Sequence, residues 1–351
     1  MLKRRKSEGV TISKLILSLD GGGIRGAATT QFLCHVETLL KKQHKKSIRQ
    51  CADFYAGTST GSIIALALAT TDMDMSDINE LYNYQNANKI FSDNRGWFQI
   101  DGVNAPKYEG NGKTSVLEKE FGKAKLSNVP RNKHVLAVTY GVERHKPEVI
   151  KSTNAIHRKL LAYEVADASS AAPTYFPTKE LKISDMEQAF WLIDGGVTAN
   201  NPTMCAIAEA IKAWPNNPMN ELRVLSIGTG YRTRKINGPA SEKWGALEWF
   251  TKGHILDLLT DERVVAYQAH TIITPGNYIR VNAEMRKQPG LAKPPDDAID
   301  DISKSNINKL KQMGDFLFEQ YGQATVDLLM DSYAGPSLDI IDTDTGMPKI
   351  R

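Results

Sequence analysis

A pattern of strand, tight turn and helix occurs twice near the start of the chain, and it limits the folds open to it. The first copy begins with the apolar run 14–19, which ends in Asp20 and three glycines. The second begins at 53–56 and passes through Gly-Thr-Ser-Thr-Gly into the apolar run 62–69. Short apolar runs that end in glycines are typical of buried strands, and longer periodic runs are typical of helices. The repeat predicts an α/β fold.

The rest of the chain keeps this alternation. Further strands are predicted at 134–141, 190–193, 222–227 and 278–281, and helices at 27–42, 203–213 and about 298–329. We find no internal repeat and no low-complexity linker. The economical interpretation is one α/β domain over residues 14–330 with helical additions, between a basic tail (1–13) and an irregular tail (331–351).

The stretch 82–112 differs from its surroundings, because it is rich in Asn, Gly and Asp yet holds several aromatic residues. Long loops of this kind are often lids or binding loops. The alternative is a surface loop whose aromatic side chains simply pack against the body.

Composition and charge exclude several classes of protein. A chain of 351 residues with 41% hydrophobic residues can bury a sizeable core, and a net charge of +4 is too small to indicate nucleic-acid binding. The three cysteines show no disulfide or zinc pattern. The longest apolar run, 63–69, falls short of the ~20 residues that a membrane span needs.

The basic residues 3–6 open the chain, and no apolar segment of the secretory kind follows them. They form either a solvated tail or a weak tether to anionic lipid. We therefore expect a cytoplasmic protein that contacts the inner face of the membrane only peripherally.

Ser59 is the candidate nucleophile. It lies in the pattern G-x-S-x-G, between a predicted strand and an apolar helix, where a nucleophile elbow is found. Gly57 and Gly61 permit the sharp turn. The N–H groups of the following helix, from Thr60 onward, point toward negative charge that develops at the serine. The alternative is a structural or phosphate-binding turn.

The glycine-rich segment 20–26 is a second candidate element. Gly21, Gly23 and Gly26 match the dinucleotide fingerprint G-x-G-x-x-G, but the acidic residue expected about 20 positions later is missing. Consecutive glycines expose backbone N–H groups, which is what an oxyanion hole requires. Arg25 either adds a positive charge there or braces the loop.

Asp194 is the candidate base, because it ends an apolar strand and is followed by Gly195 and Gly196. This position places a carboxylate at the edge of the sheet, where α/β proteins bind ligands. An unperturbed aspartate pKa near 3.9 is low for a base, so burial that raises it would help. An ordinary Asp-Gly turn is one alternative, and a triad completed by His254 or His270 is another.

Taken together, these segments resemble the patatin-like phospholipases, a family of lipid acyl hydrolases with a Ser-Asp dyad. The resemblance covers roughly residues 15–329. It rests on segments that occur in the family's order, at 20–26, 57–61, 170–177, 194–196, 226–230 and 244–249.

The resemblance implies a three-layer α/β/α fold with a mainly parallel central sheet, and neither metal nor cofactor. It further implies that Ser59 attacks an acyl ester and Asp194 takes its proton, so that an acyl-enzyme forms. The N–H groups of Gly22 and Gly23, with Arg25 near by, would hold the oxyanion. Four aromatic residues are candidates for the acyl channel or for core packing: Tyr175, Phe176, Trp244 and Trp249.

A finer resemblance is to bacterial patatin-like effectors of antiviral signalling, although plant and other bacterial patatins look similar at this level. Such effectors are activated by a cyclic nucleotide and then degrade the cell's phospholipids. The expected partners are therefore a phospholipid membrane surface and a cyclic nucleotide, the latter bound by Arg or Lys of 107–125 or 131–151. The alternative function is a non-catalytic lipid- or nucleotide-binding protein on the same scaffold.

Overall fold

The computed structural model describes residues 13–92, 105–182, 190–253 and 261–351. Its centre is one ten-stranded sheet in the order β10-β9-β8-β7-β1-β2-β3-β6-β5, with β4 also paired to β3. The strands are β1 (Lys14–Leu19), β2 (Phe54–Thr58), β3 (His134–Gly141), β4 (Lys146–Lys151), β5 (Lys179–Leu181), β6 (Phe190–Asp194), β7 (Leu222–Ile227), β8 (Tyr278–Val281), β9 (Leu338–Ile341) and β10 (Pro348–Ile350). The middle of the sheet, from β9 to β3, is parallel.

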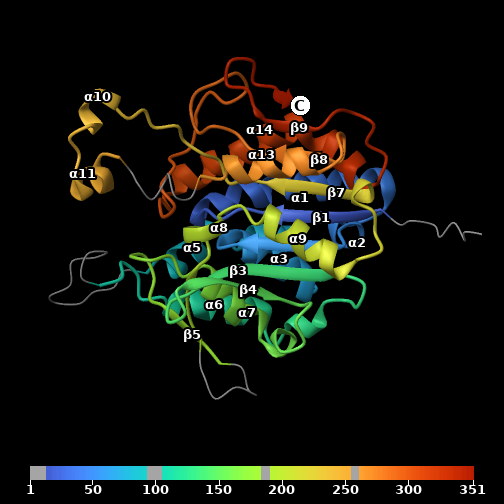
Figure 1. Cartoon of the computed structure of the whole chain (residues 1–351), viewed down its shortest axis with the longest axis horizontal. Helices are drawn as coiled ribbons and strands as arrows, with labels where there is room; N and C mark the ends of the chain where they lie inside the picture. The colour runs from blue at the N-terminus through green and yellow to red at the C-terminus, as the bar shows by residue number, and fades with distance from the viewer. Residues whose placement is uncertain (1–12, 93–104, 183–189, 254–260) are drawn as a thin grey trace, which may run out of the picture.

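Helices cover both faces of this sheet, and Figure 1 looks onto the face that α9 and α13 cover. The described helices include α1 (Gly26–His44), α2 (Ile48–Cys51), α3 (Thr60–Thr70), α4 (Met75–Glu80), α5 (Tyr84–Ile90), α6 (Asn111–Phe121), α7 (Ala162–Ser169), α8 (Gly196–Ala199), α9 (Thr203–Ala213), α10 (Gly238–Ser241), α11 (Ala246–Thr251), α13 (Arg263–Ile272) and α14 (Lys304–Leu329). The arrangement is the expected three-layer α/β/α fold.

Strand β1 shows why the central strands are mostly apolar. Leu15, Leu17 and Leu19 point into the core formed with α1, α3 and α14, whereas Ile16 points into the core formed with α9 and α13. All four side chains are fully buried. A strand that is covered on both faces cannot alternate apolar with polar residues, so the run 14–19 identified β1 with its correct bounds.

Two parts of the chain are more regular than the sequence predicts. The last segment, 331–351, was expected to be an irregular tail, and this was wrong: β9 and β10 extend the sheet beyond β8. β9 and β10 are only 4 and 3 residues long and each contains a charged residue, which hides them from pattern analysis. Within 82–112, α5 replaces part of the expected loop, and residues 93–104 lie outside the described ranges. The strands β4 and β5 were not predicted.

The long helices α1 and α14 pack closely through Gly314. A Cβ atom at this position would lie 2.6 Å from the carbonyl oxygen of Ala28 and 2.7 Å from the Cβ atom of Gln31. The helix backbones can therefore approach only while residue 314 has no side chain. Within the described ranges, no helix combines the length and the apolarity that a membrane crossing requires.

We predict that Gly314→Ala destabilises the protein, although alanine normally favours a helix over glycine. Overpacking against a backbone carbonyl costs about 1–3 kcal/mol in the free energy of unfolding. Urea denaturation measures the change. Gly238→Ala is the matched control, since a Cβ atom there meets nothing within 4 Å. Equal stability of the two variants would contradict the prediction.

Candidate active site

Ser59 lies in a strained elbow between β2 and α3. Its backbone has φ +54° and ψ −125°, a conformation that non-glycine residues rarely adopt. Close backbone contacts hold the turn: a Cβ atom on Gly57 would lie 2.3 Å from the carbonyl oxygen of Gly61, and one on Gly61 would lie 2.1 Å from that of Leu19. Both positions therefore require glycine, and the elbow presents Ser59 at the carboxyl end of β2.

The register of β3 brings Asp194 to this serine. The strand β4 occupies one edge of β3 from Leu136 to Gly141, so β2 and β6 share the other edge and approach it from opposite directions. Thr58, the last residue of β2, pairs with Val138, and Asp194, the last residue of β6, pairs with Thr139. The two strands thus end head to head, and hydrogen bonding by the Ser59 side chain lowers the pKa of the Asp194 carboxylate.

The carboxylate of Asp194 is buried, and its environment changes its pKa. Only 5% of the residue is exposed, and this burial raises its pKa to about 6, against the opposing effects of the Ser59 hydrogen bond, the Gly196 N–H and the charge of Lys113. The N–H of Gly196 donates to Oδ1 at 2.7 Å and orients the group. Gly195 is required because a Cβ atom would lie 2.3 Å from the Val138 carbonyl oxygen. A carboxylate with this pKa is ionised at neutral pH and more basic than an exposed one.

The glycine loop lies beside the elbow. A Cβ atom on Gly21 would lie 3.1 Å from Cβ of Ser59, and the Gly21 N–H is already donated to the Asn200 carbonyl. Among the described residues, no group accepts a hydrogen bond from the N–H of Gly22 or Gly23. These two donors are therefore available to a ligand next to the serine. At Gly23, φ is +57°, which favours glycine.

The other predicted members of this site stabilise the loop or border it. The Nε atom of Arg25 donates to the Gly22 carbonyl at 3.2 Å, so Arg25 braces the loop. Thr60 begins α3, where the first N–H groups have no partner within the helix. Gly26 faces Thr60, because a Cβ atom there would lie 2.4 Å from the threonine hydroxyl.

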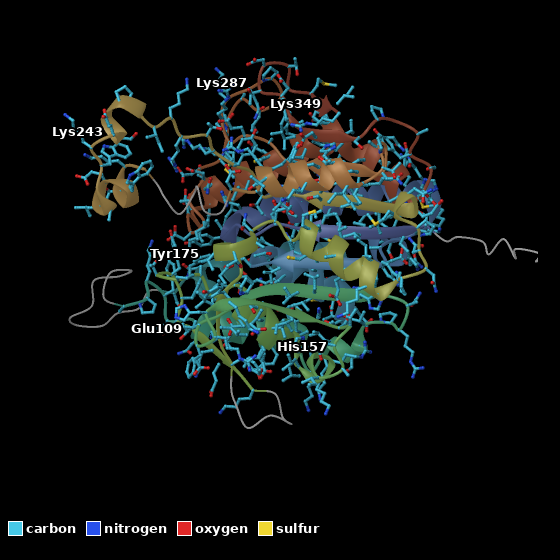
Figure 2. The ribbon with its side chains drawn as sticks, viewed as in Figure 1. Glu109, His157, Tyr175, Lys243, Lys287 and Lys349 are labelled. Atoms are coloured by element: carbon cyan, nitrogen blue, oxygen red, sulfur yellow. The ribbon has the colours of Figure 1, made fainter. Side chains whose placement is uncertain are left out.

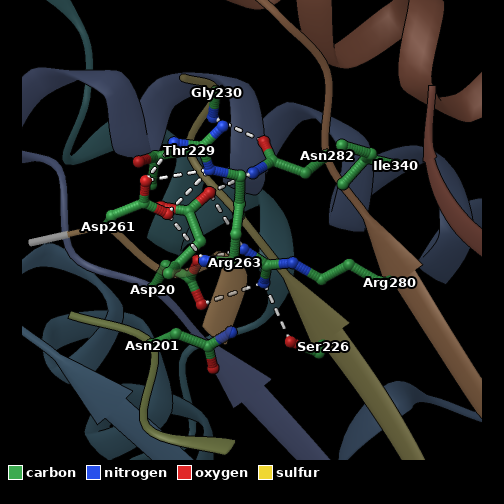
Figure 3. Close-up of polar contacts among 12 residues, drawn as sticks. Asp20, Asn201, Ser226, Thr229, Gly230, Asp261, Arg263, Arg280, Asn282 and Ile340 are labelled. Carbon is green, nitrogen blue, oxygen red and sulfur yellow. Dashed lines mark hydrogen bonds and ion pairs between the residues drawn. The ribbon is translucent and has the colours of Figure 1, made fainter. Parts of the chain in front are cut away.

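A buried ion pair anchors the start of the glycine loop. Asp20 accepts hydrogen bonds from Nη1 and Nη2 of Arg280 at 3.1 and 2.5 Å, and both residues are at most 1% exposed. Figure 3 shows the guanidinium between Asp20 and Ser226, whose hydroxyl it contacts at 2.8 Å. Burial raises the pKa of Asp20, and the charge of Arg280 opposes that rise. The sequence analysis missed Arg280, although a lone arginine inside an apolar strand was a signal.

The end of α7 contacts both Ser59 and Asp194, and Ser169 was not among the predicted site residues. The Ser169 hydroxyl accepts a hydrogen bond from the Ser59 N–H at 3.1 Å and donates one to the Val138 carbonyl at 2.7 Å. The Ala171 carbonyl accepts one from the Asp194 N–H at 3.0 Å. The segment 169–171 thus contacts the backbone of the nucleophile and that of the acid.

The rival triad finds no support in the described residues. The ring of His270 packs against that of Tyr278 on β8, with centroids 4.5 Å apart, and its Nε2 atom has no partner among the described residues. His254 lies outside the described ranges.

The four predicted channel aromatics occupy different places. Phe176 packs with Phe91 and Tyr108, at ring distances of 5.7 and 5.5 Å. The rings of Trp244 and Trp249 meet edge to face, with centroids 5.4 Å apart, in the α10–α11 segment, which stands clear of the body in Figure 1. Figure 2 shows Tyr175 on the side of the body from which that segment projects.

An elbow serine, an adjacent buried carboxylate and a free pair of glycine N–H groups together define a hydrolase-type site on an α/β sheet. The family model for patatin-like phospholipase matches residues 17–207. The chain belongs to this family, and by class it is a lipid hydrolase.

Individual relatives are similar over most of this chain. Patatin-like protein 4 of Arabidopsis thaliana is 30% identical, over 87% of this chain and 83% of its own length. Patatin-like protein 2 of Oryza sativa subsp. indica is 28% identical, over 91% of this chain and 86% of its own. Among solved structures, VipD from Legionella pneumophila superposes with a TM-score of 0.47 at 14% identity, over 93% of this chain and 70% of its own.

We predict that Arg280→Met destabilises the fold by about 3–5 kcal/mol, because it leaves the buried Asp20 carboxylate without its counter-charge. Chemical denaturation measures the loss. Arg286→Met is the control: its side chain is half exposed and pairs with Glu284 at 3.4 Å, so its change should stay within about 0.5 kcal/mol. Similar losses of stability in both variants would show that the Asp20–Arg280 pair contributes no more to the free energy of unfolding than an exposed ion pair does.

Proposed function

We propose that this protein hydrolyses fatty acyl esters of phospholipids through a dyad of Ser59 and Asp194. The observation that carries the proposal is the register on β3 that sets the elbow serine against Asp194, a buried carboxylate whose pKa is raised to about 6. A serine hydroxyl becomes a useful nucleophile when an adjacent base removes its proton. Family membership supplies the lipid ester as the substrate class.

In the first half of the reaction, Asp194 takes the proton from the Ser59 hydroxyl while Oγ attacks the acyl carbonyl carbon. The carbonyl oxygen becomes an oxyanion, which the N–H groups of Gly22 and Gly23 and the start of α3 can stabilise. The C–O bond to the glycerol oxygen then breaks. Asp194 returns its proton to that oxygen, so that the lysophospholipid leaves and an acyl-serine remains.

In the second half, Asp194 takes a proton from a water molecule, which attacks the acyl-serine. The same N–H donors stabilise the second oxyanion. The bond between the acyl carbon and Oγ breaks, Ser59 recovers its proton from Asp194, and the fatty acid is released. No step requires a metal ion or an organic cofactor.

We further propose that the enzyme works at the surface of a phospholipid membrane. Exposed apolar side chains near the site and on the projecting segment support this. Val197, which follows the acid by three positions, is 38% exposed, Trp191 on β6 is 41% exposed and Leu247 on α11 is 73% exposed. Apolar side chains of this kind can enter the interface between headgroups and acyl chains.

Activation by a cyclic nucleotide, with a role in antiviral defence, stays a prediction from the finer resemblance. A cavity of about 500 Å³ lies at the amino end of β3, whereas the dyad lies at the carboxyl end of β2. His134 and Lys151, from the segment 131–151 that was predicted to supply such a pocket, line it together with Lys212. The assay below therefore includes an arm with cyclic nucleotides.

We predict that Ser59→Ala lowers the release of fatty acid from phospholipid vesicles by about 10³-fold or more, because no acyl-enzyme can form. Asp194→Asn should lower it by about 10²–10⁴-fold through loss of the base. Each protein is assayed with and without cyclic nucleotides, and Ser127→Ala, at an exposed serine, is the control. Undiminished activity of Ser59→Ala would exclude the dyad and favour a binding protein.

We predict an acid limb in the pH profile of kcat/KM with its midpoint near the Asp194 pKa of about 6. The reaction needs the ionised carboxylate, so activity is present above this pH and is lost as the pH falls through it. Vesicle assays across the acid range measure the limb. A midpoint near the ordinary aspartate value of about 3.9 would contradict the assignment.

A further inference from the structure

We propose that Lys113 is a positioning residue for the reaction: its buried ammonium group holds the end of α7 in the position from which that segment orients both Ser59 and Asp194. This inference rests on the proposed dyad. It assigns to a lysine outside every recognised motif the task of keeping nucleophile and base in register.

The ammonium group is buried and fully engaged. Lys113 is 2% exposed, and its Nζ atom contacts the Ser170 carbonyl at 2.7 Å, the Ser170 hydroxyl at 3.0 Å, the Asp167 carbonyl at 3.0 Å and Oδ1 of Asp167 at 3.1 Å. An ammonium group has three protons to donate, and four oxygen atoms surround them. Burying such a charge is costly unless it is paired in this way, so the lysine and its partners form one rigid unit.

The position of the contacts on α7 gives the lysine its role. This helix ends at Ser169, and the last carbonyl groups of a helix have no partner within it and carry partial negative charge. Lys113 supplies the missing donor and a positive charge at that end. Lys113 donates hydrogen bonds to Ser170, which lies between Ser169 and Ala171. Ser169 contacts the Ser59 N–H, and Ala171 contacts the Asp194 N–H.

The charge of Lys113 also reaches the acid. Among the described residues, Lys113 is the charged group whose field acts on Asp194, and it lowers the pKa of that carboxylate. Asp167 on α7 and Lys179 on β5 lie on the other side of Lys113: the Lys179 ammonium meets Oδ2 of Asp167 at 2.7 Å. Burial lowers the pKa of Lys113 and the charge of Asp167 opposes that change, while the ammonium in turn favours ionised Asp194.

Lys179 offers a matched control for these two effects. It pairs with the same aspartate as Lys113, but it is 22% exposed and its other polar partner is the Thr114 hydroxyl, at 2.7 Å. It contacts none of the residues 169–171. Loss of Lys179 therefore weakens the ion pair without releasing the segment that supports the dyad.

The test compares Lys113→Met, Lys113→Arg and Lys179→Met with the wild-type protein, using fatty-acid release from phosphatidylglycerol and phosphatidylcholine vesicles across the acid pH range. Lys113→Met should lower kcat by about 10-fold or more with KM changed less than about twofold, because the reacting groups lose their geometry. Its acid limb should move to higher pH by about half a unit to one unit, since a positive charge near Asp194 is lost.

Lys113→Arg keeps the charge but not the shape, so its acid limb should return to the wild-type position while kcat stays below the wild-type value. Lys179→Met should keep kcat within about threefold of the wild type, as expected for a partly exposed ion pair. A folded Lys113→Met protein with wild-type kcat and limb would overturn the proposal, as would a limb displaced equally in the Met and Arg variants.

Ser170→Ala tests the positioning role if Lys113→Met does not unfold cooperatively and is therefore not properly folded. It removes one of the three hydrogen-bond acceptors of the ammonium group and leaves the lysine in place, so kcat should fall by about two- to fivefold with the acid limb unmoved. Wild-type kcat in this variant would overturn the positioning role. Failure of the dyad itself is read separately, from activity that Ser59→Ala leaves intact in the same assay.

Discussion

The site depends on a single constraint: two strands share one edge of β3. Because β4 fills the other edge over residues 136–141, the nucleophile strand and the acid strand must use the remaining edge in sequence. They meet at the adjacent positions Val138 and Thr139, which sets Ser59 against Asp194. Backbone hydrogen bonds along a buried sheet edge fix this register more firmly than side-chain contacts could, since a slip of one residue would turn every side chain to the other face.

Two buried cations contact the segments on either side of this junction. On one side, Arg280 on β8 holds Asp20 and so fixes the first residue of the glycine loop. On the other, Lys113 on α6 holds the end of α7. Both cations are almost completely buried. In such surroundings, a carboxylate that lost its cation would be strongly unfavourable. Charged groups that take no part in the reaction thus position the uncharged parts of the site, which are the glycine N–H groups and the helix ends.

Much of the fold could be predicted because the central strands are buried on both faces. Mostly apolar runs gave the bounds of β1, β3, β7 and β8, and periodicity gave α1 and α9 within a few residues. The strands that were missed are those whose burial is partial. Strands β4, β5, β9 and β10 mix charged with apolar residues at the margins of the sheet, so neither period nor composition distinguishes them from loops.

The sequence by itself determined the local chemistry: an elbow that only glycines at 57 and 61 allow, a loop of exposed N–H groups, and an aspartate at a strand end. Those features depend on neighbouring residues and are therefore visible in short motifs. The tertiary structure decided which distant residues contact one another. These contacts include the pairing of Ser59 with Asp194 and the contacts of Arg280, Ser169 and Lys113. The physical reason is that strand register and the burial of charge arise from contacts between distant segments, which no local pattern records.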